Sequence, residues 1–284
     1  MPIIFKDVKY VYGAKTPFEY DALNGIDLTF EGHKLTAIVG RTGSGKSTLI
    51  QHINALLRPT SGEVLIDDFV NGPKNKIKAK EIKELRKKVG LVFQFPEYQL
   101  FQETVEKDVS FAPKNFGVPK EEAIEKAHEA LQRVGLNESF YSRSPFELSG
   151  GEKRKVAIAG ILAAHPDVLI LDEPTAGLDP AASKETMDLF KQIHSEGTDV
   201  FLVTHDMNLV ARYADRVIVI DDGRIAFDGD PKALFNEDLE QYSLDNPDIY
   251  RFAKALTKRG LKLPTRDLRT VEDLAKAIKE AKHE

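Results

Sequence analysis

One stretch of eight residues limits the fold of this chain more than any other. Residues 40–47 match the pattern G-x-x-x-x-G-K-S in full. An apolar run rich in β-branched residues precedes it at 35–39, and a helical pattern with one apolar face follows from Ser47. A strand, a glycine-rich turn and a helix in this order predict a largely parallel α/β sheet with a phosphate-binding loop.

The residue types of this loop fit phosphate binding. Its glycines let the backbone curl so that several N–H groups point at phosphate oxygens, and the following helix adds its positive end. We expect Lys46 to reach the β- and γ-phosphates, Ser47 to ligate Mg²⁺ and Thr48 to donate to a phosphate. The predicted phosphate-binding set is Gly40, Thr42, Gly43, Ser44, Gly45, Lys46, Ser47 and Thr48. The alternative, a glycine-rich turn without a ligand, does not explain the strand and helix on either side.

Two acidic residues follow a second apolar run. Residues 168–171 read as a buried strand, and Asp172 and Glu173 come directly after it. Because α/β sheets place ligands at the carboxyl ends of their strands, we predict that Asp172 binds Mg²⁺, directly or through water. Glu173 is predicted to orient and polarise an attacking water. Two acids after a strand are weak evidence alone and gain weight only from the other motifs.

A third motif, Leu-Ser-Gly-Gly-Glu at 148–152, lies between the first two. With these motifs in this order the chain resembles the ATP-binding cassette (ABC) ATPases over about residues 3–235. The resemblance implies an α/β P-loop NTPase with a mostly parallel core sheet, N-terminal antiparallel strands, an inserted helical subdomain and a small C-terminal helical module. It also implies ATP hydrolysis, with ATP and Mg²⁺ bound at a site that two cassettes complete together. Ser149, Gly150 and Gly151 would then bind the ATP held by the partner's phosphate loop, at a second helix N-terminus.

The resemblance assigns three further polar residues. Gln94 matches the glutamine that senses the γ-phosphate and Mg²⁺, and His205 matches the histidine that contacts the γ-phosphate. Asp179 lies in Gly-Leu-Asp-Pro at 177–180, which matches the loop that crosses the dimer interface. The implied catalytic residues are Glu173, His205 and Gln94, and the implied metal ligands are Ser47, Gln94 and Asp172. A lone histidine after a strand is more often structural, so the shared order of the motifs carries this interpretation.

The sequence pattern leaves the roles of two residues open. Tyr12 matches the aromatic that stacks on adenine, while Tyr10 and Phe18 are alternatives for the same role. Glu152 stands where the family usually has glutamine. A carboxylate in the first turn of a helix suits the helix dipole, yet it would repel an incoming γ-phosphate if it pointed that way. We expect a mild effect.

The segment after Gln94 narrows the resemblance further. It reads FPEYQLF at 95–101, which is similar to the ATPases of energy-coupling factor (ECF) transporters, importers of vitamins or transition-metal ions, and most to the second, A′-type, of their two paired ATPases. This implies a heterodimer with a related ATPase, with a homodimer as the alternative. It also implies a transmembrane coupling protein docking near Phe95–Phe101 and a substrate-binding membrane protein.

The docking interpretation makes a structural expectation. Tyr98 and Phe101 should be exposed around a groove, with Glu97 and Asp108 nearby to meet basic helices of a membrane protein. The alternative is that residues 95–101 form an apolar turn packed inside their own helical subdomain.

Changes of pattern along the chain predict three parts. Expected strands lie at 3–12, 26–39, 63–66, 168–171, 200–203 and 217–220, with a hairpin at 223–224; expected helices lie at 47–57, 121–134 and 271–282, within a charged helical region at 78–164. From these we predict a nucleotide-binding core at 1–78 and 166–235, a helical signature subdomain at 79–165, and a C-terminal dimerisation module at 236–284.

Composition removes some functions. A net charge of −5 gives no reason to expect nucleic acid as a partner, and the absence of cysteine excludes disulfides and thiolate metal sites. No apolar run reaches the roughly 18–20 residues that span a bilayer, and the N-terminus is too charged for a signal peptide. If the protein works at a membrane, other proteins must hold it there, and the resemblance to ECF transporter ATPases implies a peripheral protein on the cytoplasmic face.

Other functions remain open at this stage. The chain could serve another ABC importer or exporter, or be a soluble ABC ATPase that acts on DNA or ribosomes, although such proteins usually carry two cassettes or a coiled-coil insertion. A nucleotide switch that hardly hydrolyses ATP is disfavoured because Glu173 and His205 are both present. No residue reports the cargo.

Overall fold

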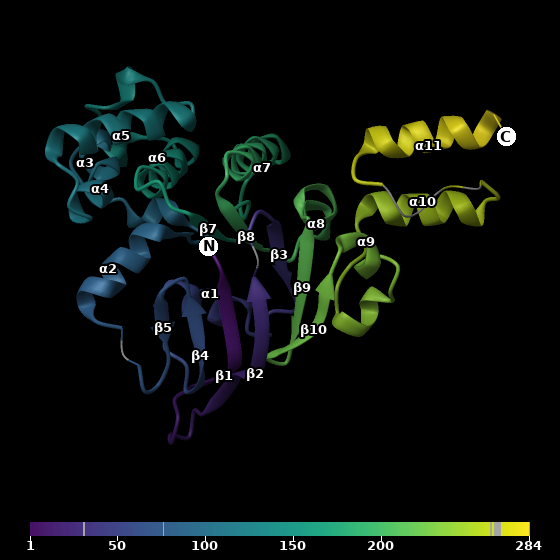
Figure 1. Cartoon of the computed structure of the whole chain (residues 1–284). Helices are drawn as coiled ribbons and strands as arrows, with labels where there is room; N and C mark the ends of the chain where they lie inside the picture. Colours follow the sequence, from purple (N-terminus) through teal and green to yellow (C-terminus); the bar gives the residue numbers. More distant parts are fainter. Residues whose placement is uncertain (31, 76, 262, 264–267, 284) are drawn as a thin grey trace.

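Two β-sheets form the centre of the protein (Figure 1). The computed structural model describes residues 1–30, 32–75, 77–261, 263 and 268–283. The larger sheet has the order β10-β9-β3-β8-β7-β6, and its strands are β3 Leu35–Val39, β6 Val89–Val92, β7 Val168–Asp172, β8 Asp199–Val203, β9 Arg216–Asp221 and β10 Arg224–Gly229. All neighbours in this sheet are parallel except the β9–β10 hairpin. The expectation of a mostly parallel α/β core is confirmed.

The smaller sheet is antiparallel and comes from the N-terminal part of the chain. Its order is β2-β1-β4-β5, with β1 Ile3–Tyr12, β2 Tyr20–Phe30, β4 Ser61–Ile66 and β5 Phe69–Asn71. In its register Tyr12 is paired with Tyr20, so both side chains lie on one face of the sheet. This sheet confirms the expected antiparallel N-terminal strands.

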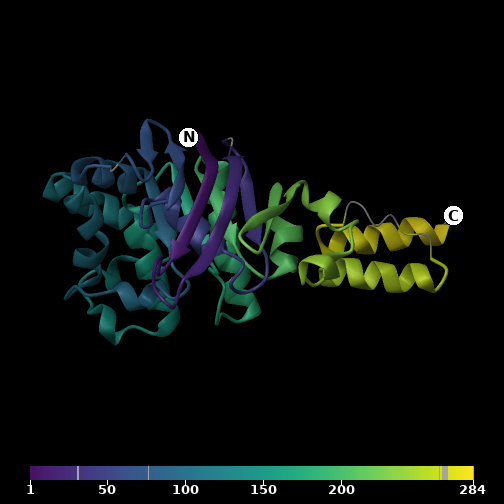
Figure 2. The ribbon, with the colours of Figure 1, turned by 90° about the horizontal axis from the view of Figure 1, so that it is seen from below.

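The helices form three groups around the sheets. The α-helices are α1 Lys46–Ile53, α2 Ala79–Lys88, α3 Val105–Val109, α4 Phe111–Asn115, α5 Lys120–Arg133, α6 Gly150–Leu162, α7 Pro180–Ser195, α8 Met207–Tyr213, α9 Pro231–Leu234, α10 Asp248–Lys258 and α11 Val271–His283. Short 3₁₀ turns are η1 Pro96–Gln99, η2 Glu138–Phe140, η3 Pro145–Glu147 and η4 Leu239–Tyr242. Figure 1 shows α3–α6 gathered on one side and α10–α11 beyond β9 and β10 on the other. Figure 2 shows the α10–α11 pair extending away from the sheets.

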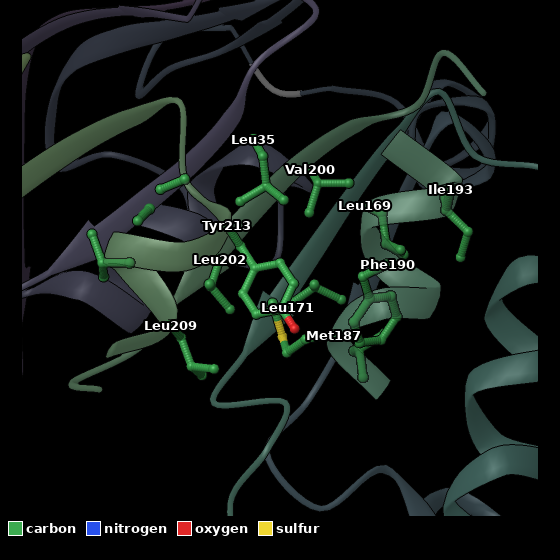
Figure 3. Packing of buried hydrophobic residues seen from close by; sticks show 14 of the residues in the cluster. Leu35, Leu169, Leu171, Met187, Phe190, Ile193, Val200, Leu202, Leu209 and Tyr213 are labelled. Atoms are coloured by element: carbon green, nitrogen blue, oxygen red, sulfur yellow. The ribbon is translucent and has the colours of Figure 1, made fainter. Parts of the chain in front are cut away.

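Alternation along the parallel strands produces two apolar cores. On one face Leu169, Leu171, Val200 and Leu202 belong to a cluster that includes Phe190 of α7 (Figure 3). On the other face Val168, Ile170, Phe201 and Val203 pack with residues of α1 and the smaller sheet. Since successive side chains of a strand point to opposite faces, a strand buried on both faces reads as an unbroken apolar run. This is why the three parallel strands with such runs are recognisable in the sequence.

The structure departs from the expected elements at two places. The run predicted as one strand at 26–39 is two strands in different sheets, because the chain leaves β2 at Phe30 and turns through His33, whose φ is +63°. The charged region at 78–164 also contains β6, which pairs with β7 at the edge of the larger sheet. Four apolar residues beside a charged helix are too few to show a period, so only the pairing identifies β6.

The apolar face of α7 should carry much of the stability of this core. Phe190 is fully buried, so Phe190→Ala leaves a cavity, and we expect a loss of about 3–5 kcal/mol in the free energy of unfolding. Urea denaturation followed by circular dichroism measures this. The neighbouring exposed Lys191→Ala is the control and should change the midpoint little. Equal effects of the two changes would contradict the packing described here.

Candidate active site

Four adjacent parallel strands bring the predicted catalytic residues to one edge. The order β3-β8-β7-β6 places the phosphate loop after β3, His205 after β8, Glu173 after β7 and Gln94 after β6. Parallel strands end at the same edge of a sheet, so these residues converge although the chain separates them widely. The site is thus built at the position where α/β sheets bind ligands.

The phosphate loop is shaped by close backbone contacts. Gly40 has φ +146°, and a Cβ there would lie 2.2 Å from the Ile220 carbonyl oxygen; a Cβ on Gly45 would lie 2.5 Å from the Ala22 carbonyl oxygen. No other residue type fits at these two positions. The Lys46 Nζ donates to the Gly40 and Arg41 carbonyl oxygens at 2.7 and 2.8 Å. Its ammonium therefore lies against the curled loop, where phosphate oxygens can replace these carbonyls.

The loop also contains a polar atom that fits a nucleotide. The Ser44 Oγ is buried and has no hydrogen-bond partner within the described part of the chain. A buried polar atom without a partner costs free energy, and a phosphate oxygen would supply the missing contact. The residues present therefore fit a bound nucleoside triphosphate.

Two interactions that support the loop are not evident from the sequence. The Tyr20 hydroxyl donates to the Gly43 carbonyl oxygen at 2.7 Å. Arg41 forms ion pairs with Asp221, at 3.2 Å, and with Asp222, both in the β9–β10 hairpin region. The sequence contains no signal for either contact because the partners are brought close only by sheet pairing.

The acidic residues and His205 form one connected group. The His205 Nδ1 lies 2.8 Å from the Glu173 Oε1, and the Glu173 N–H donates to the Val203 carbonyl oxygen at 2.9 Å. Glu173 has φ +48°, an unfavourable conformation for a non-glycine residue that is often held at functional sites. The turn holds its carboxylate at the sheet edge against His205, and polarising a water beside the phosphate loop remains our proposal for it.

Asp172 and Lys46 influence each other's ionisation. Burial raises the pKa of Asp172, and the Glu173 charge raises it further, while a hydrogen bond from Ser47 and the Lys46 charge oppose the shift. Burial lowers the pKa of Lys46, and Glu173 and Asp172 oppose that change. A cation placed among these carboxylates would relieve the repulsion between Asp172 and Glu173.

The donor set suits magnesium. Burial raises the pKa of Asp172 and Ser47, in the first turn of α1, opposes this rise, so the Ser47 hydroxyl and the carboxylate at the end of β7 belong to one site. Mg²⁺ prefers such oxygen ligands along with phosphate oxygens and water, and the Gln94 side-chain amide would add another. When bound, the ion would neutralise charge on the phosphates. We propose Ser47, Asp172 and Gln94 as its protein ligands.

Tyr12 lies beside the phosphate-loop helix. Its hydroxyl is 3.3 Å from the Thr48 Oγ1, and its ring packs edge-on against Tyr10 at 4.7 Å between ring centroids. Tyr12 is 39% exposed, whereas Tyr10 also packs against the buried His52. Tyr12 is therefore the better placed of the two to stack on a base, and adenine stacking remains our proposal for it.

The signature residues stand apart from this edge. Ser149 is the N-cap of α6, and Ser149, Gly150 and Gly151 are all exposed. Over the described residues, no hydrogen bond joins them to the phosphate loop of the same chain. A Cβ on Gly150 or Gly151 would meet nothing within 4 Å, so the helix N-terminus is open to an approaching anion.

Glu152 is turned back onto Ser149. Its Oε2 accepts from the Ser149 N–H at 2.8 Å and from the Ser149 hydroxyl at 2.7 Å, and the Glu152 N–H donates to the Ser149 Oγ at 3.4 Å. This reciprocal arrangement is a capping box, and it lowers the pKa of Glu152. The carboxylate therefore points at its own N-cap, where it accepts hydrogen bonds within the same helix turn.

Asp179 has a local structural role. Its Oδ1 accepts from the Ala181 and Ala182 N–H groups at 2.9 and 3.0 Å, so it caps the N-terminus of α7. The cap fixes the loop at 177–180 at the surface. Contact of this loop with a partner's nucleotide remains a proposal.

These features together define an ATP-binding cassette: a phosphate loop, an acidic strand end, a histidine beside it and an exposed signature helix. A family model described as "ABC transporter" matches residues 23–176, and the chain belongs to this family. It is accordingly an ABC ATPase.

Curated relatives cover nearly the whole chain. The "Energy-coupling factor transporter ATP-binding protein EcfA2" of Streptococcus agalactiae is 52% identical over 283 residues, covering 98% of this chain and 99% of that protein. The protein of the same name from Enterococcus faecalis is 50% identical, with 99% of each covered.

Solved structures agree with the fold. The structure of cbiO1 from Clostridium perfringens, part of the ABC transporter complex cbiONQ, superposes with a TM-score of 0.73 at 38% identity, covering 91% of this chain and 96% of that one. A dimeric cassette, MJ0796, described in a post-hydrolysis state bound to ADP and Pi, superposes with a TM-score of 0.71 at 31% identity, covering 81% and 98%.

Glu173 should be essential for turnover and dispensable for binding. Glu173→Gln keeps the side-chain shape but removes the base, so we expect ATP hydrolysis to fall roughly 10²–10⁴-fold while ATP binding persists and a closed dimer accumulates. Phosphate release, nucleotide binding and size-exclusion chromatography measure the three quantities. Full residual turnover would remove Glu173 from its catalytic role.

The fifth signature position should matter little. In Glu152→Gln the amide oxygen can accept the same two hydrogen bonds from Ser149, so we expect an ATPase rate within about tenfold of the original in the assembled complex. Glu152→Ala removes the acceptor and should have the larger effect. A change above tenfold for the glutamine variant would show that the charge itself acts on the nucleotide.

Proposed function

We propose that this chain is the ATP-hydrolysing subunit of an ECF-type importer, paired with a related ATPase and docked on a transmembrane coupling protein. The observation that carries the proposal is the exposed aromatic surface directly after Gln94, on a chain about half identical to ECF ATPases along nearly all its length. ATP binding would close the dimer, hydrolysis would reopen it, and the movement would pass to the membrane partners.

The aromatic residues of this surface face outward. Tyr98 is 83% and Phe101 56% exposed, which excludes burial of both within the helical subdomain. Phe95 lies near Tyr98, and Phe101 packs edge-on against the exposed Phe111 at 4.9 Å between ring centroids. Exposed aromatic clusters of this kind mark interaction surfaces.

An apolar groove lies beside this surface. It has a volume of about 240 Å³ and runs between the core and the helical subdomain, with a lining that includes Leu56, Phe93, Ala112, Phe116 and Ile161. Ala112 follows Phe111 directly in α4, so this helix contributes to both the groove and the aromatic cluster. A helix of a membrane protein is the proposed occupant, since its apolar face would cover both.

Of the two carboxylates expected to meet basic helices, Asp108 has internal contacts and Glu97 has one oxygen buried. The Asp108 Oδ2 accepts from the Phe101 and Gln102 N–H groups at 2.9 and 2.8 Å, and it thereby fixes the loop that presents Phe101. The Glu97 Oε2 is buried. The groove is also lined by Arg86 and Lys87. The docking proposal therefore depends on apolar contact and not on acidic charge.

The proposal of a dimer rests on the signature turn, which has no phosphate to bind within its own chain. The exposed Ser149–Gly151 turn supplies an anion site with no phosphate of its own chain, and the similar cassette MJ0796 is described as a dimer with ADP and Pi. A second contact is proposed between C-terminal modules. There α10 and α11 line an apolar groove of about 630 Å³ with Phe252, Val271 and Leu274, and Phe252 and Val271 are exposed.

Membrane attachment and cargo complete the proposal. Within the described ranges, no helix is long and apolar enough to cross a bilayer, so we propose attachment to the cytoplasmic face through the coupling protein. A substrate-binding membrane protein would select the cargo, a vitamin or a transition-metal ion.

Loss of the exposed aromatics should separate docking from catalysis. In the double variant Tyr98→Ala with Phe101→Ala we expect membrane-bound protein to fall by ~10-fold or more, because central aromatic anchors dominate interfaces. Thermal stability should hold, since both side chains are largely exposed. Membrane co-sedimentation, followed by mass spectrometry of the co-purified proteins, measures docking and identifies the partners.

The matched control is Phe18→Ala, which removes an 86% exposed aromatic from the β1–β2 turn. It should leave sedimentation unchanged. Recovery of the original chain only in the supernatant, or with DNA or ribosomes, would replace the transport function by a soluble one.

A further inference from the structure

A buried arginine connects the two loops that flank the catalytic edge. Arg154, on α6 just beyond the signature, is only 5% exposed. Its Nη1 donates to the Ala176 carbonyl oxygen at 2.9 Å, and its Nη2 donates to the carbonyl oxygens of Pro174 at 2.5 Å and Gln94 at 3.3 Å. One guanidinium thus joins the signature helix to the loop after Glu173 and to the loop of Gln94.

Arg154 donates to backbone carbonyl oxygens, so it connects the main chain of the two loops. Pro174 and Ala176 follow Glu173 directly, and Gln94 precedes the docking segment Phe95–Phe101. The planar guanidinium holds several acceptors at fixed relative positions, which a lysine cannot do. A displacement of either loop must therefore move the other or break a charge-assisted bond.

The hydrogen-bond network around Arg154 leaves two polar atoms of opposite charge without partners among the described residues. The Arg154 Nε and the Glu97 Oε2 are both buried and both without a hydrogen-bond partner in the described structure. Glu97 belongs to η1 in the docking segment, and its charge opposes the lowering of the Arg154 pKa that burial produces. Because η1 packs against α6, the two unpaired buried atoms lie on neighbouring elements, and pairing them would satisfy a donor and an acceptor of opposite charge.

We propose that Arg154 is a positioning residue that links the docking segment to the loop behind Glu173, with Glu97 as its switch. When a partner presses η1 inward, Glu97 closes an ion pair with the Arg154 Nε, and the guanidinium shifts the carbonyls of Pro174 and Ala176 with it. The source of the movement rests on the proposed docking function. The link between the two loops rests only on the contacts of Arg154.

The first experiment needs no membrane partner. Hydrogen exchange of the full chain, with Arg154→Lys compared with Lys153→Gln on the same helix, reports on the two loops. We expect Arg154→Lys to speed exchange ~10-fold or more in both 94–98 and 174–178, because the lysine cannot hold both sets of carbonyls. Faster exchange in one loop only, or none, would overturn the link.

The second experiment distinguishes positioning from packing. In the ATPase complex isolated from membranes, Arg154→Lys should lower kcat ~10-fold while KM for MgATP changes less than ~3-fold, because nucleotide contacts stay intact. If kcat is unchanged while Arg154→Lys and the original chain are equally stable to heat, Arg154 has no positioning role.

The third experiment tests the switch. Glu97→Gln should leave the ATPase rate of the detergent-separated ATPase pair unchanged and reduce the stimulation that the membrane partner causes. Combined with Arg154→Lys, its effect on stimulation should vanish, since both changes break one pair. Undiminished stimulation in Glu97→Gln would overturn the switch. Should Arg154→Lys fail to fold, this variant still decides the proposal.

Failure of the docking function can be distinguished from failure of the Arg154 link. If the original chain does not co-purify with membranes, the proposed source of movement and the Glu97 switch are overturned together. Hydrogen exchange in Arg154→Lys then still decides whether the two loops are linked.

Discussion

The parallel register of β3, β8, β7 and β6 is the constraint on which the rest depends. It aligns the carboxyl ends of four strands, so that residues from distant parts of the chain meet at one edge. The register is itself held by apolar side chains packed on both faces of the sheet. A one-residue slip would exchange the two faces of a strand and would also displace Glu173 and His205 from each other.

We propose that the active site at this edge is one half of a catalytic unit made by two chains. Phosphate loop, acidic strand end and histidine come from one chain, while the signature turn of that chain, Ser149–Gly151, is exposed and capped by Glu152. Electrostatic stabilisation of a transferred phosphoryl group needs donors around the developing charge. In the proposed dimer the exposed turn at Ser149 would supply such donors to the partner's nucleotide, which would couple hydrolysis to association.

The surface after Gln94 is the proposed docking site for the membrane partner. Exposed aromatics and an apolar groove lie where the core meets the helical subdomain, and Arg154 connects that region to the loop behind Glu173. A signal from a membrane partner would therefore travel through backbone contacts of one buried side chain. The unpaired Glu97 Oε2 and Arg154 Nε are the atoms at which we propose that this connection changes.

The sequence by itself determined the fold class, the phosphate loop and the order of the motifs, because these depend on local periodicity and on glycines that no other residue can replace. It did not reveal β6, the break between β2 and β3, or the contacts of Tyr20 and Arg154, since each depends on partners distant in the chain. The inward turn of Glu97 and Asp108 was also decided only by tertiary structure, whereas the contact of Glu152 with Ser149 is a local capping box of the S-x-x-E type. The direction of the Asp108 carboxylate follows from the N–H donors of Phe101 and Gln102, and the fold of that loop sets those donors in place.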